Sequence, residues 1–275
     1  MKKALSILLA VIVVIAGLVP AFIIRFKARE PVSLSAAGIG SETDPIYLTA
    51  HRGGNTEAPE NSLPSFRSAA EKGFWAAECD IIRTKDGRWV ITHDDSVRKH
   101  FFGTGKVTEM TFDEVRQLRY SFDTEFIKYR DEKIPSLEEY LDVFKDSPTR
   151  PEIEIKSKGT EGLEDVVSEI ARRGLTEKAI IISFHYESLE RIREFNDKIE
   201  MWYLVSKITA EEVEKAKAIG CSALSVNYKN TTKEDVALAL DNRMGIAVWT
   251  IDKPETVKTF YDMGVRYFVS NRLGN

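Results

Sequence analysis

The sequence predicts an α/β fold in which eight parallel strands, joined by helices, close into a (β/α)8 TIM barrel. Two observations support this. Residues 44–275 provide roughly 230 positions, which is a usual size for such a barrel. Within them, short apolar runs typical of strands alternate with longer amphipathic stretches typical of helices. Because that alternation is the pattern of parallel βαβ units, we expect one barrel domain over residues 44–275.

Nine strand-like runs occur, one more than the barrel holds. Between the second and the third run, the turn sequence Lys85-Asp86-Gly87 favours a hairpin, and no helix separates them. We therefore expect the third run to fold back antiparallel, which returns His93 to the level of Asp80. The runs are Tyr47–His51, Ala77–Arg83, Trp89–His93, Glu152–Lys156, Ile180–Phe184, Met201–Val205, Ala223–Val226, Ile246–Ile251 and Tyr267–Ser270.

Glycines and capping residues mark the helix ends. A glycine follows each of three amphipathic stretches, as is typical of a helix C-terminus. These stretches are Leu163–Arg173, Ala210–Ile219 and Pro254–Met263.

Between about residues 95 and 150 the alternation of strands and helices breaks, and we expect an insertion after the hairpin. This insertion contains two helical patterns that begin at Thr111 and Ser136, each with an acidic residue three positions on.

Residues Ala4–Ile24 are uncharged, and about 21 apolar residues suffice to cross a hydrocarbon core of roughly 30 Å as a helix. We expect residues 1–29 to be an uncleaved single-pass membrane anchor. A cleaved signal peptide is the alternative, although its apolar region is normally shorter. Basic residues flank both sides of this stretch, so the orientation is inferred from the very short N-terminal tail, which favours a C-terminal domain outside the cytoplasm. Residues 30–43 are small and polar, which is typical of a tether.

Composition excludes some partners. The chain has 275 residues, 43% of them hydrophobic and 30% charged, with a formal net charge of −4. This mild acidity argues against a nucleic-acid partner, which would need clustered Lys and Arg. No feature of the sequence indicates an obligate protein partner. The two cysteines, Cys79 and Cys221, are too few for a disulfide framework, and we expect both to be buried as small hydrophobic residues.

Glu78 and Asp80 lie two positions apart in a predicted strand, so their side chains point to the same face. Two carboxylates in a shared space repel each other and are costly to desolvate, unless a cation or a shared proton compensates them. A hard divalent ion is the simplest compensation. A solvated strand face is the alternative. However, His51 and His93 each end a strand-like run, and two histidines bracketing the pair favour a functional site.

Several short motifs follow one another in a specific order. They include His51-Arg52-Gly53, Pro59-Glu60-Asn61, Glu78-Cys79-Asp80, Thr84-Lys85-Asp86-Gly87, His93-Asp94, Glu152-Ile153-Glu154-Ile155-Lys156 and Val248-Trp249-Thr250-Ile251. With these motifs, the sequence from about Tyr47 to the C-terminus resembles the glycerophosphodiester phosphodiesterase family, within the superfamily of phospholipase C-like barrel phosphodiesterases. One motif departs from the family pattern, because Ser270-Asn271-Arg272-Leu273 stands where Thr-Asp-x-Pro is common.

The resemblance implies hydrolysis of a glycerophosphodiester to glycerol 3-phosphate and an alcohol, through a cyclic phosphate. One divalent ion, Mg²⁺ or Ca²⁺, would be held by Glu78, Asp80 and Glu154. His51 and His93 would exchange the roles of acid and base, since imidazole titrates near neutral pH. Which histidine is the first base stays open.

Further residues are expected around these five. Arg52 and Lys156 would add positive charge for the phosphate, and an arginine fork suits phosphate oxygens. Glu60 is expected either to act in the site or to order the loop around Arg52. Trp249 is expected to wall the pocket, with packing in the barrel core as its alternative. Glu152 is read as structural or as the partner of a lysine or arginine.

Two other functions stay open. A lysophospholipase D would use the same residues on a lysophospholipid, and an outward-facing domain could act on polyglycerol-phosphate wall polymers (teichoic acid). An apolar groove in the insertion would favour the first. A third possibility is a catalytically inactive barrel that serves only as a binding module. The motifs argue against it, because none of their histidines or carboxylates is missing. The groove would be lined by Phe101, Phe102, Phe122 and Phe126.

Overall fold

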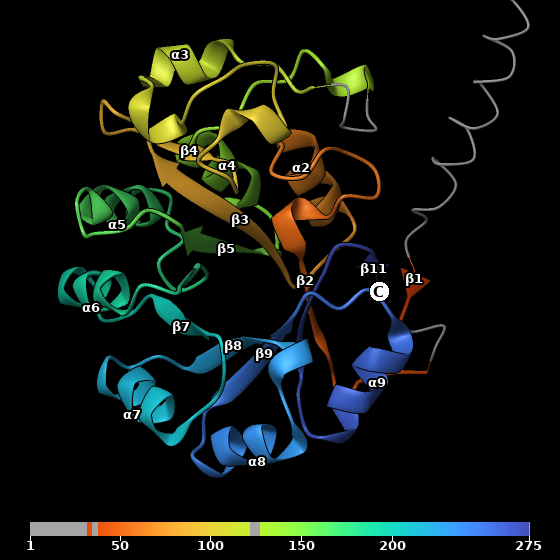
Figure 1. The fold of residues 1–275 in the computed structure, drawn as a ribbon. Coiled ribbons are helices and arrows are strands. Elements are labelled where there is room, and N and C mark those ends of the chain that lie inside the picture. Colours follow the sequence, from red (N-terminus) through yellow and green to blue (C-terminus); the bar gives the residue numbers. More distant parts are fainter. Residues whose placement is uncertain (1–31, 35–37, 122–126, 275) are drawn as a thin grey trace, which may run out of the picture. The chain divides into compact units, whose positions relative to one another are not determined.

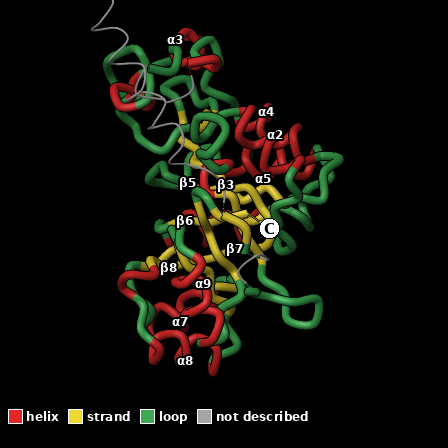
Figure 2. The backbone as a smooth tube through the Cα atoms, turned by 90° about the vertical axis from the view of Figure 1, so that its right-hand side faces the viewer, coloured by secondary structure: helices red, strands yellow, loops and turns green. Residues whose placement is uncertain are grey.

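The barrel predicted from the sequence is present. The structure, a computed structural model, describes residues 32–34, 38–121 and 127–274. Among the described strands, eight parallel ones close into a barrel, because β2 pairs with both β10 and β3. They lie at the centre, with helices around them (Figures 1 and 2). In chain order they are β2 (Tyr47–Ala50), β3 (Ala76–Arg83), β5 (Arg150–Ile155), β6 (Ile180–Ser183), β7 (Glu200–Val205), β8 (Ala223–Asn227), β9 (Gly245–Trp249) and β10 (Tyr267–Ser270).

A helix connects each barrel strand to the next. Alternate strand residues point outward and pack with the apolar faces of these helices into the main hydrophobic core. Cys79 and Cys221 are free and buried, as predicted. The connecting helices are α2 (Leu63–Glu71), α4 (Leu137–Phe144), α5 (Leu163–Arg172), α6 (Tyr186–Phe195), α7 (Ala210–Ala218), α8 (Lys233–Asp241) and α9 (Pro254–Asp262).

The predicted hairpin accounts for the ninth strand-like run. The strand β4 (Trp89–Ile91) pairs antiparallel with β3, with Arg83 opposite Trp89. Beyond the strand, the Thr92 amide donates a hydrogen bond to the Asp80 carbonyl at 3.0 Å. His93 therefore stands beside Asp80, as the turn signal indicated.

The insertion is shorter than the predicted residues 95–150. The insertion contains the short helix α3 (Phe112–Gln117) and the 3₁₀ turns η4 (Val97–Lys99), η5 (Val107–Glu109) and η6 (Ile127–Tyr129). It has a small apolar core of its own, which lies beside β4 and outside the barrel (Figure 1). The second predicted helix, α4, instead packs beside α2 and contributes to the main core. Both helices begin with the predicted capping boxes, at Thr111 and Ser136.

Part of the segment predicted as a tether packs onto the barrel. The strand β1 (Val32–Ser33) pairs in parallel with β11 (Leu273–Gly274). Leu34 and Ile39, only 1% and 5% exposed, join the main core, which explains why this polar stretch does not run free. The predicted membrane helix, residues 4–24, lies outside the described residues. Within those that are described, no helix combines the length and the apolar character needed to cross a membrane.

Aromatic rings fill the N-terminal end of the barrel. The Tyr47 and Tyr267 rings stack with centroids 5.0 Å apart, and Trp75 stacks on Trp202 at 5.8 Å. Arg150 covers Trp75 at 4.8 Å from the ring centroid. Because this end is closed by packed rings, the inward-facing polar side chains gather at the C-terminal ends of the strands, where TIM barrels place their active sites.

We predict that Tyr140→Phe lowers the free energy of unfolding by about 1 to 2 kcal/mol. The buried Tyr140 hydroxyl lies 2.6 Å from the Ala77 carbonyl on β3 and 3.1 Å from the Glu152 carbonyl on β5, so it links the two strands. Urea denaturation measures the change. The control is Tyr186→Phe, because the Tyr186 hydroxyl has no hydrogen bond within the described ranges; its change should stay within about 0.5 kcal/mol. Equal losses in both variants would contradict the prediction.

Candidate active site

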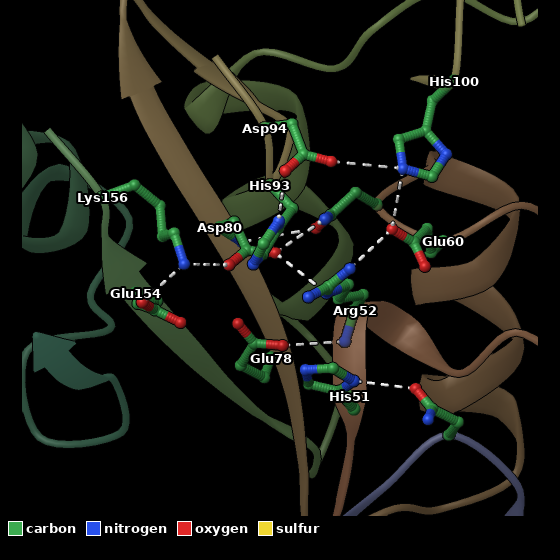
Figure 3. A network of polar contacts seen from close by, with 12 residues as sticks. His51, Arg52, Glu60, Glu78, Asp80, His93, Asp94, His100, Glu154 and Lys156 are labelled. Carbon is green, nitrogen blue, oxygen red and sulfur yellow. Dashed lines mark hydrogen bonds and ion pairs between the residues drawn. The ribbon is translucent and has the colours of Figure 1, made fainter. Parts of the chain in front are cut away.

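Three carboxylates meet at the C-terminal mouth of the barrel. The parallel register sets Asp80 of β3 beside Glu154 of β5, and Glu78 lies on the same face of β3. One carboxylate oxygen from each residue lies within 4.8 Å of the others. Glu78 and Asp80 are only 2% and 1% exposed. Figure 3 shows the three side chains pointing toward one another.

Burial and mutual repulsion control the protonation of this carboxylate cluster. Burial, together with the charges of Asp80 and Glu154, raises the pKa of Glu78 well above its ordinary value. Burial and the Asp80 charge also raise the pKa of Glu154 to about 7. Burial acts on Asp80 in the same direction, but the positive charges of Arg52 and other nearby cations keep its pKa below the ordinary value.

The cluster fits a hard divalent cation. Glu78 Oε1 and Asp80 Oδ1 are buried, and neither has a hydrogen-bond partner in the part of the chain that the structure describes. Asp80 Oδ1 lies 3.6 Å from Lys156 Nζ, but buried carboxylate oxygens without a hydrogen bond are costly, and a cation that binds oxygen ligands would satisfy them. The predicted metal ligands Glu78, Asp80 and Glu154 are therefore the residues that the fold brings together.

A tight turn carries Arg52 over the cluster. The 3₁₀ turn η3 (His51–Gly53) follows β2 directly, and Arg52 has a positive φ of 54°. Gly53 has a φ of 80°, and a side chain there would collide with the Ser65 hydroxyl. In this conformation the Arg52 amide donates a hydrogen bond to Glu78 Oε2 at 2.8 Å. The glycine is needed because helix α2 packs against the turn.

Two acidic partners orient the Arg52 guanidinium. Arg52 Nη1 lies 2.7 Å from Glu60 Oε1, and Arg52 Nε lies 3.3 Å from Asp80 Oδ2. Glu60 does not line the cavity described below, so of its two expected roles the structure favours the ordering of Arg52. Asn61 donates from Nδ2 to Asp80 Oδ2 at 2.8 Å, while Ser62 caps α2.

His51 is held in one tautomer. Asp252 accepts hydrogen bonds from the Asn271 backbone amide, at 2.8 Å, and from Asn271 Nδ2, at 3.1 Å. Asn271 therefore turns its Oδ1 toward His51 Nδ1, at 2.7 Å, and Nδ1 must carry the proton. Burial and the charge of Arg52 lower the pKa of His51 below its ordinary value, so the ring is neutral and Nε2 keeps its lone pair.

His93 has a carboxylate partner instead. Its Nδ1 lies 3.1 Å from Asp94 Oδ1. His100, from the insertion, places Nε2 at 3.6 Å from Asp94 Oδ2 and 3.5 Å from Glu60 Oε1 (Figure 3). Burial lowers the pKa of His93, although the negative charge of Asp80 works against that shift. The insertion thus contributes one side chain to the surroundings of the site.

These side chains surround a cavity of about 150 Å³. Trp249 lines it and meets the ring of Phe184, 40% exposed, edge to face at 6.0 Å. Phe101 is buried in the core of the insertion, so it does not line the predicted groove, and Phe122 and Phe126 lie outside the described residues. Of the nine predicted site residues, seven line the cavity: His51, Arg52, Glu78, His93, Glu154, Lys156 and Trp249.

Several residues of this network were not identified from the sequence. Asn61 and Asp94 adjoin predicted site residues, so their positions carried a usable signal. His100, Asp252 and Asn271 carried none, because their partners are distant in sequence; His51 and Asn271 are 220 positions apart. The Ser270-Asn271 motif, which departs from the family pattern, supplies Asn271, the residue that orients His51.

Together, the fold and the site define a (β/α)8-barrel enzyme, with two histidines beside carboxylates and cations. The profile of the glycerophosphoryl diester phosphodiesterase family matches residues 51–275. The chain belongs to this family, and it is an enzyme of the phosphodiesterase class.

Individual relatives agree. A glycerophosphodiester phosphodiesterase of Caldanaerobacter subterraneus is 29% identical over 223 residues, which cover 79% of this chain and 90% of the relative. The human glycerophosphodiester phosphodiesterase 1 is 32% identical over 177 residues, 62% of this chain and 53% of that one. A phosphodiesterase of Oleispira antarctica, solved with the product sn-glycerol-3-phosphate, has the same fold with a TM-score of 0.75; it is 24% identical and covers 87% of this chain and 96% of that one.

We predict that the affinity for Mg²⁺ or Ca²⁺ falls as the pH is lowered from about 8 to about 6. The pKa of Glu154 is raised to about 7, so below that pH a proton competes with the ion for this ligand. Each proton displaced costs up to about tenfold in affinity per pH unit. Titration calorimetry measures this. Glu154→Gln should bind more weakly and with a flatter pH dependence, and a wild-type affinity that is constant over the range would contradict the prediction.

Proposed function

We propose that this protein is a metal-dependent glycerophosphodiester phosphodiesterase that releases glycerol 3-phosphate and an alcohol. The observation that carries the proposal is the convergence of two histidines, three carboxylates and two cations on one cavity. Hydrolysis of a phosphodiester needs neutralisation of the phosphate charge, a base for the nucleophile and an acid for the leaving group. The family and the names of the relatives support the same substrate class.

In this proposal, Glu78, Asp80 and Glu154 hold one divalent ion, Mg²⁺ or Ca²⁺. When bound, the ion supplies positive charge for the phosphate oxygens. Arg52 and Lys156 bind the remaining phosphate oxygens from the cavity wall. Lys156 Nζ lies 2.9 Å from Glu154 Oε1, so its ammonium group stands at the edge of the carboxylate cluster and faces the substrate.

His51 is the first base. Its Nε2 accepts the proton of the glycerol hydroxyl next to the phosphate, and that oxygen attacks the phosphorus. The amide of Asn271 holds the ring in the tautomer that this step needs. His93 gives a proton to the leaving alcohol oxygen as its bond to phosphorus breaks. Burial lowers the pKa of His93, and the contact with Asp94 acts in the opposite direction, toward the charged imidazolium. Water then opens the cyclic phosphate, with the two histidines in reversed roles.

A lysophospholipase D is the second candidate. The exposed Phe184 ring and Trp249 form an apolar wall at the mouth of the cavity, where an acyl chain could lie. Release of choline from lysophosphatidylcholine, compared with glycerophosphocholine, separates the two candidates. Wall polymers of polyglycerol phosphate are tested in the same assay by their release of glycerol 3-phosphate.

We predict that His51→Ala and His93→Ala each lower kcat for glycerophosphocholine at least about 100-fold, because each removes one proton-transfer group. The full chain is assayed for glycerol 3-phosphate with EDTA, with Mg²⁺ and with Ca²⁺, and EDTA should abolish the release. His185→Ala is the matched control, since His185 is half-buried and is not one of the cavity residues; its rate should stay within about twofold. A metal-independent rate, or an active His51→Ala variant, would contradict the mechanism.

We also propose that residues 1–29 anchor the catalytic domain in the cell membrane, facing outward. The uncharged stretch Ala4–Ile24 supports this. The full chain should remain in the membrane fraction after an alkaline wash, whereas a chain that begins at Glu30, and so keeps β1 and the core residues Leu34 and Ile39, should be soluble. Protease added to intact cells should degrade the domain. A full chain found in the soluble fraction would overturn the anchor, and protection from the protease would overturn the orientation.

A further inference from the structure

Glu152 is a buried acid that the proposed mechanism does not use. It lies on β5 two residues before Glu154, level with Glu78, and is 0% exposed. Its Oε2 accepts a hydrogen bond from the Thr49 hydroxyl at 3.1 Å, and not from a lysine or arginine, which was one of the two roles that the sequence left open. Its Oε1 has no hydrogen-bond partner among residues 32–34, 38–121 and 127–274.

Two more polar atoms share this situation. Ser225 of β8 is 1% exposed, and its Oγ is unpaired within the described structure. Nε1 of Trp249 on β9 is likewise buried and has no hydrogen-bond partner among the described residues. The strands β8 and β9 lie across the barrel from β5. All three residues nevertheless line the one cavity that also reaches His51 and Glu78.

Three such atoms around a single cavity require an explanation. Buried polar groups are almost always hydrogen-bonded, and each unpaired one is costly. Between them, Ile182, Leu204 and Val269 provide apolar wall. Apolar walls with a few convergent polar groups are typical of a small-ligand site. The groups comprise a carboxyl oxygen at Glu152, whose pKa burial raises to about 8, a donor at Trp249 and a hydroxyl at Ser225 that can donate or accept, which suits the hydroxyls of a short polyol.

Size limits the ligand. The cavity has a volume of about 150 Å³. A cavity of roughly this volume holds a molecule of about six heavy atoms, such as benzene. Glycerol also has six heavy atoms, so the glycerol group of the substrate fits this cavity. Choline without the phosphate is of similar size, but once esterified it has no hydroxyl for the three polar groups to bind, whereas the glycerol group keeps two free hydroxyls.

We propose that Glu152, Ser225 and Trp249 form a hydroxyl-binding floor that receives the terminal hydroxymethyl group of the substrate's glycerol. The inference rests on the proposed function and deepens it. The glycerol end enters first, its terminal hydroxyl reaches the floor, and its neighbouring hydroxyl lies near His51. The phosphate then lies at the level of Arg52 and Lys156, and the alcohol points outward.

The test compares two substrates that differ only at the floor. Glycerophosphocholine has the terminal hydroxymethyl group; 2-hydroxyethyl phosphocholine lacks it but keeps the hydroxyl that attacks the phosphorus. We expect the wild-type full chain to prefer the former at least about tenfold in kcat/KM, since a site built for a hydroxyl rejects the analogue without it. Ser225→Ala and Glu152→Gln should each reduce this preference about tenfold. Ser206→Ala is the matched control: Ser206 is exposed at the end of β7, does not line the cavity, and should leave the preference unchanged.

The outcomes separate the two proposals. If the wild type hydrolyses neither substrate, the proposed function fails, and the floor with it. If it hydrolyses both equally, or if both variants keep the wild-type preference while remaining folded, the floor is overturned and the proposed function stands. Thermal unfolding monitors the fold. Ser225→Ala decides alone if Glu152→Gln is unstable, because it removes a hydroxyl that has no partner in the described structure.

Discussion

The register between β3 and β5 is the constraint on which the site depends. It sets Asp80 beside Glu154 and Glu78 beside Glu152. Because side chains alternate between the two faces of a strand, a slip of one residue would turn these carboxylates into the apolar layer under the helices. Cys79, Ile153 and their neighbours would then fill the cavity. The pairing that builds the barrel wall therefore also creates the charge density at its mouth.

Such charge density is unfavourable without compensation, and the compensation comes from loops. Arg52 and Asn61, both with positive φ, bring a guanidinium and an amide onto Asp80. Positive φ is uncommon for residues other than glycine, and such conformations persist where the surroundings hold them. Here the Arg52 amide is fixed by Glu78, and the Asn61 amide by the Arg52 carbonyl. Glu78 thus fixes the conformation of the loop, and the side chains of that loop in turn compensate the charge of Asp80.

The sequence predicted what depends on local pattern. Strand and helix periods, the Asp-Gly turn and the two capping boxes gave the barrel, the hairpin that positions His93, and most of the cavity wall. It did not predict that α4 belongs to the barrel rather than to the insertion, because an amphipathic helix does not reveal which core it packs on. Nor did it predict the contact of Asn271 with His51, which forms only when β10 closes the barrel beside β2.

The partners of the two histidines differ, and this difference gives the site a direction. A neutral amide fixes the tautomer of His51 without stabilising a positive charge, which suits a ring that begins as a base. A carboxylate at the same position of His93 opposes the lowering of its pKa by burial, which suits a ring that has to act as an acid. His51 stands on the side of β2 and β10, His93 on the side of the hairpin. In the proposed binding mode, the glycerol group is held on the barrel floor, the attacking hydroxyl faces His51 and the leaving oxygen faces His93. The alcohol would then lie toward Phe184 and Trp249, so the proposal accounts for selectivity for glycerol and tolerance of the alcohol with one geometry.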